Sequence, residues 1–165
     1  MIGNDVVDLA LARQESNWKR KGFVDKIFTE KEQLLIKNAI NSEVMVWNLW
    51  SRKEAAYKIY IRKTLIRGYY PLQLECFDIE TIARTIYGKV YINKQVYYTK
   101  TTISSQLINT IAVENVTDFD TIKTLKNRKN MQKIAGIPSL FNDRTSTLQP
   151  LSISHHGRFE RIITI

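Results

Sequence analysis

The sequence predicts an α+β fold in which an antiparallel sheet packs against a long helix. Helical periodicity fills the stretch from Thr29 to Lys63, β-branched and aromatic residues dominate from Leu72 to Glu114, and Leu151 to Ile165 has the pattern of a hairpin. Runs of helices followed by runs of strands are typical of α+β domains, and such a sheet needs another layer to cover its apolar face.

The first elements are a short strand and two helices. Residues 2–9 are β-branched and alternate weakly, so they predict a strand that carries Asp5 at an exposed end. The tetrapeptide Thr29-Glu30-Lys31-Glu32 matches a capping box and predicts a helix to about Ile40. Aromatic residues at helical spacing predict a second helix over about Glu43 to Lys63.

The rest of the chain predicts strands and one further helix. An antiparallel meander is expected from Leu72 to Glu114, with turns at Tyr87-Gly88 and Asn93-Lys94. Residues 118–135 combine spaced apolar residues with many Lys and Arg, which predicts a basic surface helix. The final hairpin is expected to turn at His156-Gly157-Arg158.

The composition fits one folded domain over residues 1–165 that attracts anions. Apolar residues make up 44% of the chain, and 25 Lys and Arg against 16 Asp and Glu leave a net charge of +9. This charge favours nucleic acid, anionic lipid, a phosphorylated cofactor or an acidic protein as partner. The single Cys76 excludes an internal disulfide. Because the sequence has no basic leader and no long apolar run, we expect a cytoplasmic protein without a membrane segment.

Three stretches carry groups suited to phosphate and metal chemistry. Glu54 and Lys58 stand four residues apart, on one face of the expected helix. Asp5 lies two residues after Gly3, which permits close approach of backbone or ligand. The segment Ser152-Ile153-Ser154-His155-His156 places hydroxyls and an imidazole at a strand end, and adjacent histidines on a strand face opposite ways. Taken alone, each stretch also fits an ordinary ion pair, strand-end acid or polar turn.

Taken together and in this order, the stretches resemble the 4'-phosphopantetheinyl transferase superfamily. Gly3-Asn4-Asp5 matches a G-x-D strand, Phe28 to Glu32 an F-[ST]-x-x-E helix start, and Trp50 to Lys58 the more specific W-[SA]-x-K-E-A-x-x-K helix. A G-x-D strand that opens the chain and an S-I-S-H strand near its end resemble the small holo-acyl-carrier-protein synthases. Apolar Val7 fits this type, because the two-lobed members usually have a glutamate ligand there.

The resemblance implies a 4'-phosphopantetheinyl transferase-like fold. The stretch at about 68–147 is longer than the small synthases normally require, and its pattern predicts a strand-rich insertion. It implies an enzyme that transfers 4'-phosphopantetheine from coenzyme A to a serine of an apo acyl or peptidyl carrier protein, with Mg²⁺ and release of 3',5'-ADP. Asp5 and Glu54 would bind the metal ion and act in catalysis. Lys58 would be catalytic and contact the phosphates.

The resemblance also assigns the contacts to coenzyme A and an assembly. Ser154 and His155 would bind a phosphate of coenzyme A, and Arg13 would bind the nucleotide or the carrier. A homo-oligomer, a trimer with sites between subunits, is expected. The general base stays open among Glu54, a metal-bound water and Asp5.

Other residues have competing interpretations. Lys53 would serve the carrier or the nucleotide, whereas the capping role of Glu32 suffices for that residue. Lys126 to Lys129 would dock an acidic carrier protein or form a solvated basic face. Two other functions remain open: a coenzyme A-binding protein without catalysis, and a nucleic-acid-binding module that uses basic residues interleaved with tyrosines. These tyrosines are Tyr87, Tyr91, Tyr97 and Tyr98.

Overall fold

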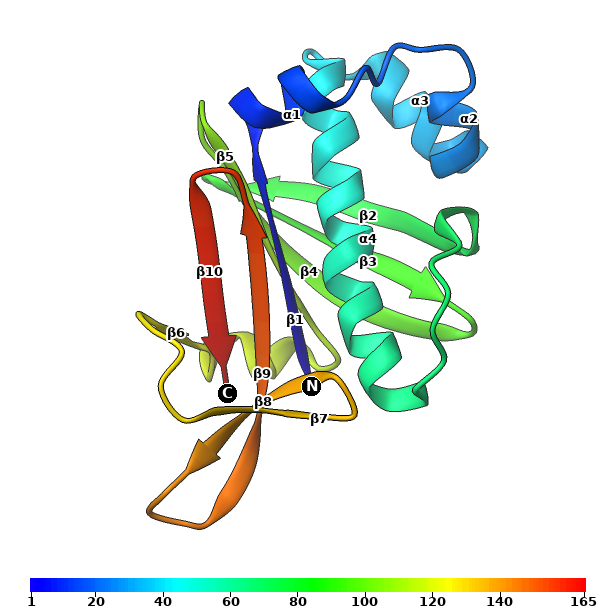
Figure 1. Ribbon diagram of the computed structural model, residues 1–165. Coiled ribbons are helices and arrows are strands. Elements are labelled where there is room, and N and C mark those ends of the chain that lie inside the picture. Colours follow the sequence, from blue (N-terminus) through cyan, green and yellow to red (C-terminus); the bar gives the residue numbers. More distant parts are fainter.

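The computed structural model describes residues 1–165 as two antiparallel sheets and a set of helices on one face of the first sheet (Figure 1). The N-terminal half contains β1 Ile2–Asp8, α1 Leu9–Glu15, α2 Phe23–Ile27, α3 Glu30–Asn38, α4 Ser42–Thr64 and the 3-10 turn η1 Pro71–Gln73. The middle contains β2 Leu74–Ile82, β3 Thr85–Ile92, β4 Gln95–Ile103, β5 Leu107–Val113 and η2 Val116–Asp120. The remaining strands are β6 Lys123–Leu125, β7 Met131–Ile134, β8 Ile137–Asn142, β9 Thr147–His156 and β10 Phe159–Thr164.

The first sheet has the strand order β1-β5-β4-β3-β2, with every neighbouring pair antiparallel. Strands β2 to β5 are the predicted meander, and Asn93 and Lys94 form its tight turn with φ of 45° and 67°. Strand β1 is confirmed and pairs with β5, but Asp5 lies in its middle, opposite Thr110 and largely buried, and the expectation of an exposed strand end is wrong. The first strand therefore closes a sheet whose other members come after the helices.

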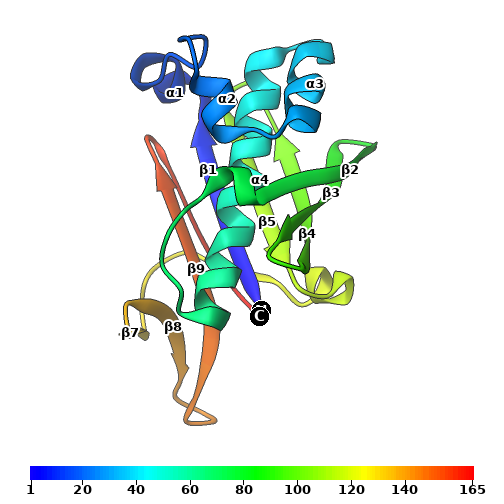
Figure 2. The ribbon, with the colours of Figure 1, turned by 90° about the vertical axis from the view of Figure 1, so that its right-hand side faces the viewer.

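Helix α4 crosses one face of this sheet (Figure 2) and supplies much of the core. Its buried apolar side chains, Leu49 and Ile59 among them, pack in one cluster with Val90 and Ile92 of β3. Asn41 caps its start, and Leu65 in a left-handed conformation ends it. The predicted helix is confirmed to within a residue at each end. No helix of the structure is both long enough and apolar enough to span a bilayer.

The capping box before α3 is confirmed, and its Glu32 carboxylate also binds other parts of the core. The Thr29 side chain accepts the Glu32 amide while the Glu32 carboxylate accepts the Thr29 amide. That carboxylate also accepts the Cys76 amide and pairs with Lys53 at 2.6 Å, all in the interior. The expectation that Lys53 serves a carrier or nucleotide is wrong, because its side chain is fully buried and bound to protein oxygens.

The second sheet has the strand order β6-β10-β9-β8-β7 and lies beside β1 (Figures 1 and 2). Strands β9 and β10 form the predicted C-terminal hairpin, and Gly157 turns it with φ of 54°. Ile2, Val113 and Ile163 form a small core where the two sheets meet. Together the observations confirm the α+β class, with two sheets where one was foreseen.

The helix predicted over residues 118–135 is wrong. This stretch contains the short 3-10 turn η2 and the strands β6 and β7. Strand β6 adds to the edge of β10, and β7 pairs with β8 across a turn at Ala135-Gly136, where both φ values are positive. The spaced apolar residues fit a helix locally, but the pairing of β6 with the distant β10 and of β7 with the neighbouring β8 prevails over that preference.

The turn predicted at Tyr87-Gly88 is also wrong, because Gly88 lies inside β3. The chain reverses earlier, at Ala83 with φ of 55°. Gly88 has a packing role: a Cβ there would stand 2.7 Å from a guanidinium nitrogen of Arg52. Arg52 is fully buried between α4 and the sheet, so the glycine makes room for it.

Candidate functional site

A cavity of about 280 Å³ lies where β1, the end of α1, α4 and β9 meet. Asp5 and Glu54 contribute carboxylates to its wall, and Trp50, His155 and His156 contribute rings. Whole small-molecule ligands usually occupy about 300–1,000 Å³, so this cavity fits one part of a larger ligand.

Gly3 brings β1 into direct contact with α4. A Cβ on residue 3 would stand 2.0 Å from the Ala55 carbonyl oxygen, so no other residue fits without moving the strand or the helix. Asp5 lies two residues further on and therefore on the same side of the strand. This close approach places Asp5 beside the helix face that carries Glu54 and Lys58.

Lys58 connects β1 with β9 as well as reaching Asp5. Its ammonium lies 3.6 Å from Oδ1 of Asp5 and donates to the carbonyl oxygens of Asn4 at 2.6 Å and Ile153 at 3.3 Å. The side chain keeps 30% of its surface exposed. Lys58 is thus fixed at the joint between the sheets with part of its charge open to solvent.

The carboxylates of Asp5 and Glu54 are both largely shielded from water. Burial, followed by the charge of Asp5, raises the pKa of Glu54 to about 7, although Lys58 acts in the opposite direction. Burial also raises the pKa of Asp5, against the influence of Lys58 and a hydrogen bond from Ser154. One lysine therefore does not compensate the two negative charges, and the site favours a further cation.

The S-I-S-H-H segment binds the free edge of β1 through side chains. Ser152 Oγ accepts the Asn4 amide at 3.0 Å, Ser154 Oγ accepts the Val6 amide at 2.9 Å, and His156 Nδ1 accepts the Asp8 amide at 2.8 Å. These are alternate residues on both strands, so the contacts repeat with the period of a strand. We call this set of three hydrogen bonds the seam.

The Asn4 side chain adds two hydrogen bonds between β1 and the C-terminal hairpin. Its Oδ1 accepts the Ser152 hydroxyl at 2.7 Å, and its Nδ2 donates to the Arg161 carbonyl at 3.0 Å. Asn4 is fully buried, so an aliphatic residue there would leave these polar groups without partners. Asparagine at the middle position of G-x-D therefore has a structural reason in this chain.

The residues predicted to bind coenzyme A lie in different surroundings. His155 lines the cavity and is exposed. Ser154 belongs to the seam and donates to Asp5 Oδ1 at 3.1 Å. Arg13 lies outside the cavity lining, where its exposed guanidinium pairs with Glu43 at 3.0 Å. The structure thus brings Asp5, Glu54 and Lys58 together with the first two but not with Arg13.

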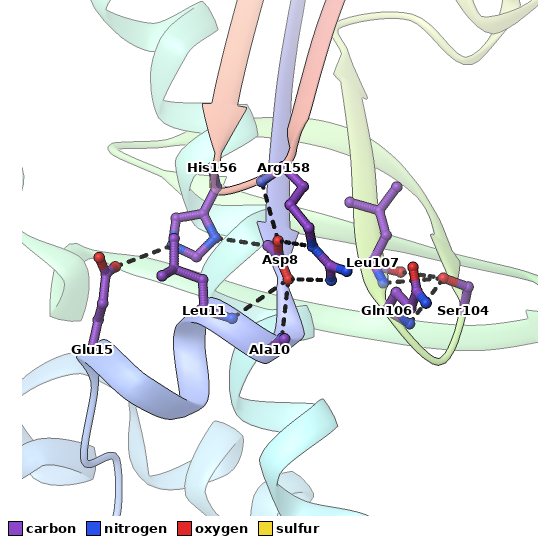
Figure 3. A network of polar contacts seen from close by, with 9 residues as sticks. All are labelled: Asp8, Ala10, Leu11, Glu15, Ser104, Gln106, Leu107, His156 and Arg158. Carbon is purple, nitrogen blue, oxygen red and sulfur yellow. Dashed lines mark hydrogen bonds and ion pairs between the residues drawn. The ribbon is translucent and has the colours of Figure 1, made fainter.

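Sequence reasoning missed Asp8, whose carboxylate links the hairpin turn to α1 (Figure 3). The carboxylate caps α1 through the amides of Ala10 and Leu11, and accepts the Arg158 backbone amide and guanidinium at 2.8–3.1 Å. Its position directly before Leu-Ala-Leu-Ala-Arg was the available signal, since aspartate favours helix N-caps. No comparable signal pointed to Ser51 and Tyr69.

Ser51 and Tyr69 carry buried hydroxyls that lie beside the two carboxylates without meeting the full geometry of a hydrogen bond. Ser51 is close enough to Asp5, and Tyr69 to Glu54, to lower the pKa of that carboxyl group against the effect of burial. The two hydroxyls are therefore part of the polar surroundings of the carboxylates.

The donor set fits a hard divalent cation. The structure has no cluster of three or more His, Cys, Asp or Glu side chains placed to hold a metal ion, so an ion here could take at most the two carboxylates of Asp5 and Glu54 from the protein. Mg²⁺ typically binds one or two carboxylates and completes its shell with phosphate and water. The negative charge that Lys58 leaves uncompensated, and the hydroxyls of Ser51 and Tyr69 beside the carboxylates, suit such a hydrated ion.

Comparison with known proteins identifies the family. A family model described as the 4'-phosphopantetheinyl transferase superfamily matches residues 1–113, from β1 through β5. A search of curated proteins gave no match. The match contains Asp5, Glu54 and Lys58, whereas the hairpin that carries His155 lies beyond it. The chain therefore belongs to the 4'-phosphopantetheinyl transferase superfamily, a family that transfers phosphopantetheine from coenzyme A to carrier proteins.

Proposed function

We propose that this protein is a Mg²⁺-dependent holo-acyl-carrier-protein synthase. It would transfer 4'-phosphopantetheine from coenzyme A to a serine of an acyl or peptidyl carrier protein and release 3',5'-ADP. The single observation that carries the proposal is that Asp5 and Glu54 line one cavity, with the Lys58 ammonium 3.6 Å from Asp5, all inside the segment that matches the family.

The reaction breaks one phosphorus–oxygen bond of the pyrophosphate and forms another with the serine oxygen, so phosphate charge is the main obstacle. Asp5 and Glu54 would hold the Mg²⁺ ion. When bound, that ion would neutralise phosphate oxygens and help align them. Lys58 supplies a second positive charge, and its bonds to Asn4 and Ile153 fix its position beforehand. Trp50 gives the cavity an apolar wall that limits water.

The serine proton has two candidate acceptors in the protein. Glu54, with its pKa raised to about 7, is a stronger base than an ordinary carboxylate, as general base catalysis near neutral pH requires. Burial raises the pKa of Asp5 as well, although its contacts with Lys58 and Ser154 act in the opposite direction. When Glu54 also holds Mg²⁺, the charge of the ion would lower the pKa of Glu54, so the base stays open between Glu54 and a metal-bound water.

We further propose that one chain carries a complete site. A trimer with sites between subunits is expected if one chain supplies only half of the residues of a site. Here the carboxylates of β1 and α4 and the histidines of β9 line one cavity within a single chain. The trimer and the cytoplasmic location remain predictions from the sequence.

Carrier docking is proposed on electrostatic grounds. Carrier proteins of this kind are acidic, so the net charge of +9 should speed encounter, and more so at low salt. The segment Lys126 to Lys129 is exposed in the loop between β6 and β7, and its two lysines line a surface hollow together with Arg144. It stays a candidate docking surface.

The test is incubation with coenzyme A, Mg²⁺ and an apo acyl carrier protein, followed by mass spectrometry of the carrier. Glu54→Gln and Asp5→Asn should each lower the transfer rate at least about a hundredfold. Glu30→Gln, an exposed change on α3, should leave the rate within about twofold. Equal rates for Glu54→Gln and the parent protein would refute the assignment.

Two other outcomes would identify the alternative functions. Binding of 3',5'-ADP without transfer to any carrier would indicate a catalytically silent family member. Salt-sensitive binding of oligonucleotides without transfer would indicate a nucleic-acid-binding module. Tyr97 could not contribute to such binding, because it is buried on the core side of the sheet.

A further inference from the structure

His156 has one ring nitrogen committed to the protein backbone. Its Nδ1 accepts the Asp8 amide at 2.8 Å, as the third contact of the seam (Figure 3). An amide N–H can only donate, so Nδ1 must keep its lone pair. The neutral ring therefore carries its proton on Nε2.

This arrangement determines what the ring can do. To act as a base through Nε2, the ring would need its proton on Nδ1, and two donors would then face each other across 2.8 Å. His156 is therefore held as a hydrogen-bond donor with a fixed tautomer. A donor fixed in this way costs little to reorganise when a ligand arrives.

The Nε2 end of the ring lacks a close protein acceptor. The nearest carboxylate oxygen, on Glu15, lies 3.6 Å away, which exceeds hydrogen-bond distance. Glu15 is 59% exposed and free to turn toward solvent, whereas His156 lines the cavity that also contains Asp5 and Glu54. The ring thus offers an unused N–H donor in the candidate site.

We propose that His156 is a substrate-binding residue that donates a hydrogen bond from Nε2 to a phosphate oxygen of coenzyme A. The inference rests on the proposed function, since that function supplies the ligand. Asp5 and Glu54 make the cavity acidic, so an oxyanion that enters it with a metal ion needs hydrogen-bond donors among the other lining residues. His156 supplies such a donor from β9.

Two substitutions separate the two nitrogens of the ring. In His156→Asn the amide oxygen lies near the position of Nδ1, so the variant can still accept the Asp8 amide but has no donor at Nε2. In His156→Gln the amide nitrogen lies near the position of Nε2, so the variant can still donate but loses the seam contact. Glu15→Gln removes the neighbouring negative charge and keeps the ring intact.

Binding is measured by calorimetry with 3',5'-ADP and with inorganic pyrophosphate, both with Mg²⁺ and without carrier. His156→Asn should keep the thermal midpoint of the parent protein and weaken binding of at least one probe about tenfold. His156→Gln should lower the midpoint but keep binding within about threefold. Glu15→Gln should bind about twofold more tightly, because one repulsive charge is gone.

The steady-state constants give a second readout. Loss of a ground-state contact should raise the KM for coenzyme A in His156→Asn, with kcat within about threefold of the parent. Parent-like probe binding in His156→Asn would overturn the inference, as would equal weakening by Asn and Gln. If His156→Asn does not fold, the Glu15→Gln result decides, and weaker binding there rejects the donor role.

The probes also separate this inference from the proposed function. Weakened pyrophosphate binding assigns the contact to the pyrophosphate, whereas weakening confined to 3',5'-ADP assigns it to a phosphate of the nucleotide. If His156→Asn weakens probe binding but the parent does not modify the carrier, the anion site is supported and the transfer reaction is rejected. If the parent transfers phosphopantetheine but His156→Asn binds the probes as the parent does, the transfer reaction is supported and the role of His156 is rejected.

Discussion

Ser154 donates a hydrogen bond of 3.1 Å to the carboxylate of Asp5, although the two residues are 149 positions apart in the chain. The same hydroxyl accepts the Val6 amide. Ser154→Ala should leave that buried amide without an acceptor and lower the free energy of unfolding by about 1–3 kcal/mol. It should also lower kcat, because Asp5 loses a positioning contact. Urea denaturation and transfer assays measure the two effects, with exposed Ser105→Ala as the control. Unchanged stability would mean that the seam does not hold β1.

Gly3→Ala tests the close approach of β1 to α4. The added methyl group would stand 2.0 Å from the Ala55 carbonyl oxygen, so the strand and helix must separate. We expect a loss of about 1–3 kcal/mol of stability, typical of overpacking, and a large loss of transfer activity. Gly22→Ala adds a methyl group in open space at another glycine, although its φ of 78° strains that position too. Activity retained in Gly3→Ala would show that Asp5 tolerates displacement.

Mg²⁺ should stabilise the free protein. An ion that binds only the folded state at ten times its dissociation constant adds about 1.4 kcal/mol. Thermal midpoints should therefore rise with Mg²⁺ in the parent protein and in Lys94→Ala, an exposed turn variant. They should stay flat in Asp5→Asn and Glu54→Gln, and EDTA should reverse the rise. A rise of the same size in all four proteins would place the ion elsewhere.

The pair of Asp8 and Arg158 predicts a loss of stability in acid. The hydrogen bonds from Arg158 hold the pKa of Asp8 well below its usual range, so the folded state favours the charged carboxylate. Its contribution is complete above the unfolded pKa of about 4 and is lost as pH falls through the lower, folded pKa. Asp8→Asn can still cap α1 but cannot form the ion pair. The stability difference between parent and Asp8→Asn should be constant from about pH 5 to 8 and shrink below about pH 4. A constant difference at low pH would contradict this assignment.

A site complete within one chain predicts activity at any assembly state. Transfer per chain should stay constant when the protein is diluted through the range in which sedimentation reports any change in mass. A specific activity that falls together with dissociation would instead support sites shared between subunits.

The sequence predicted those features that depend on local pattern. The capping box of Thr29 and Glu32, the spacing of Glu54 and Lys58 and the turn at Gly157 each involve neighbours along the chain. Contacts between distant segments were not predictable. The buried pair of Lys53 with Glu32 and the space that Gly88 leaves for Arg52 depend on how α4 packs on other elements. The helix expected over residues 118–135 failed partly for the same reason, since β6 pairs with the distant β10, and partly because β7 pairs with the neighbouring β8 in a hairpin.

The seam joins β1, the first strand of the chain, to β9 in its last hairpin, and the two partners of each contact are 148 positions apart. Contacts between such distant positions carry a large loop-closure cost and tend to form late in folding. The helix and the meander can associate before them, because they lie within one continuous segment. The cavity should therefore be the last part of the protein to mature, and a refolding chain should recover its helical circular dichroism before its activity.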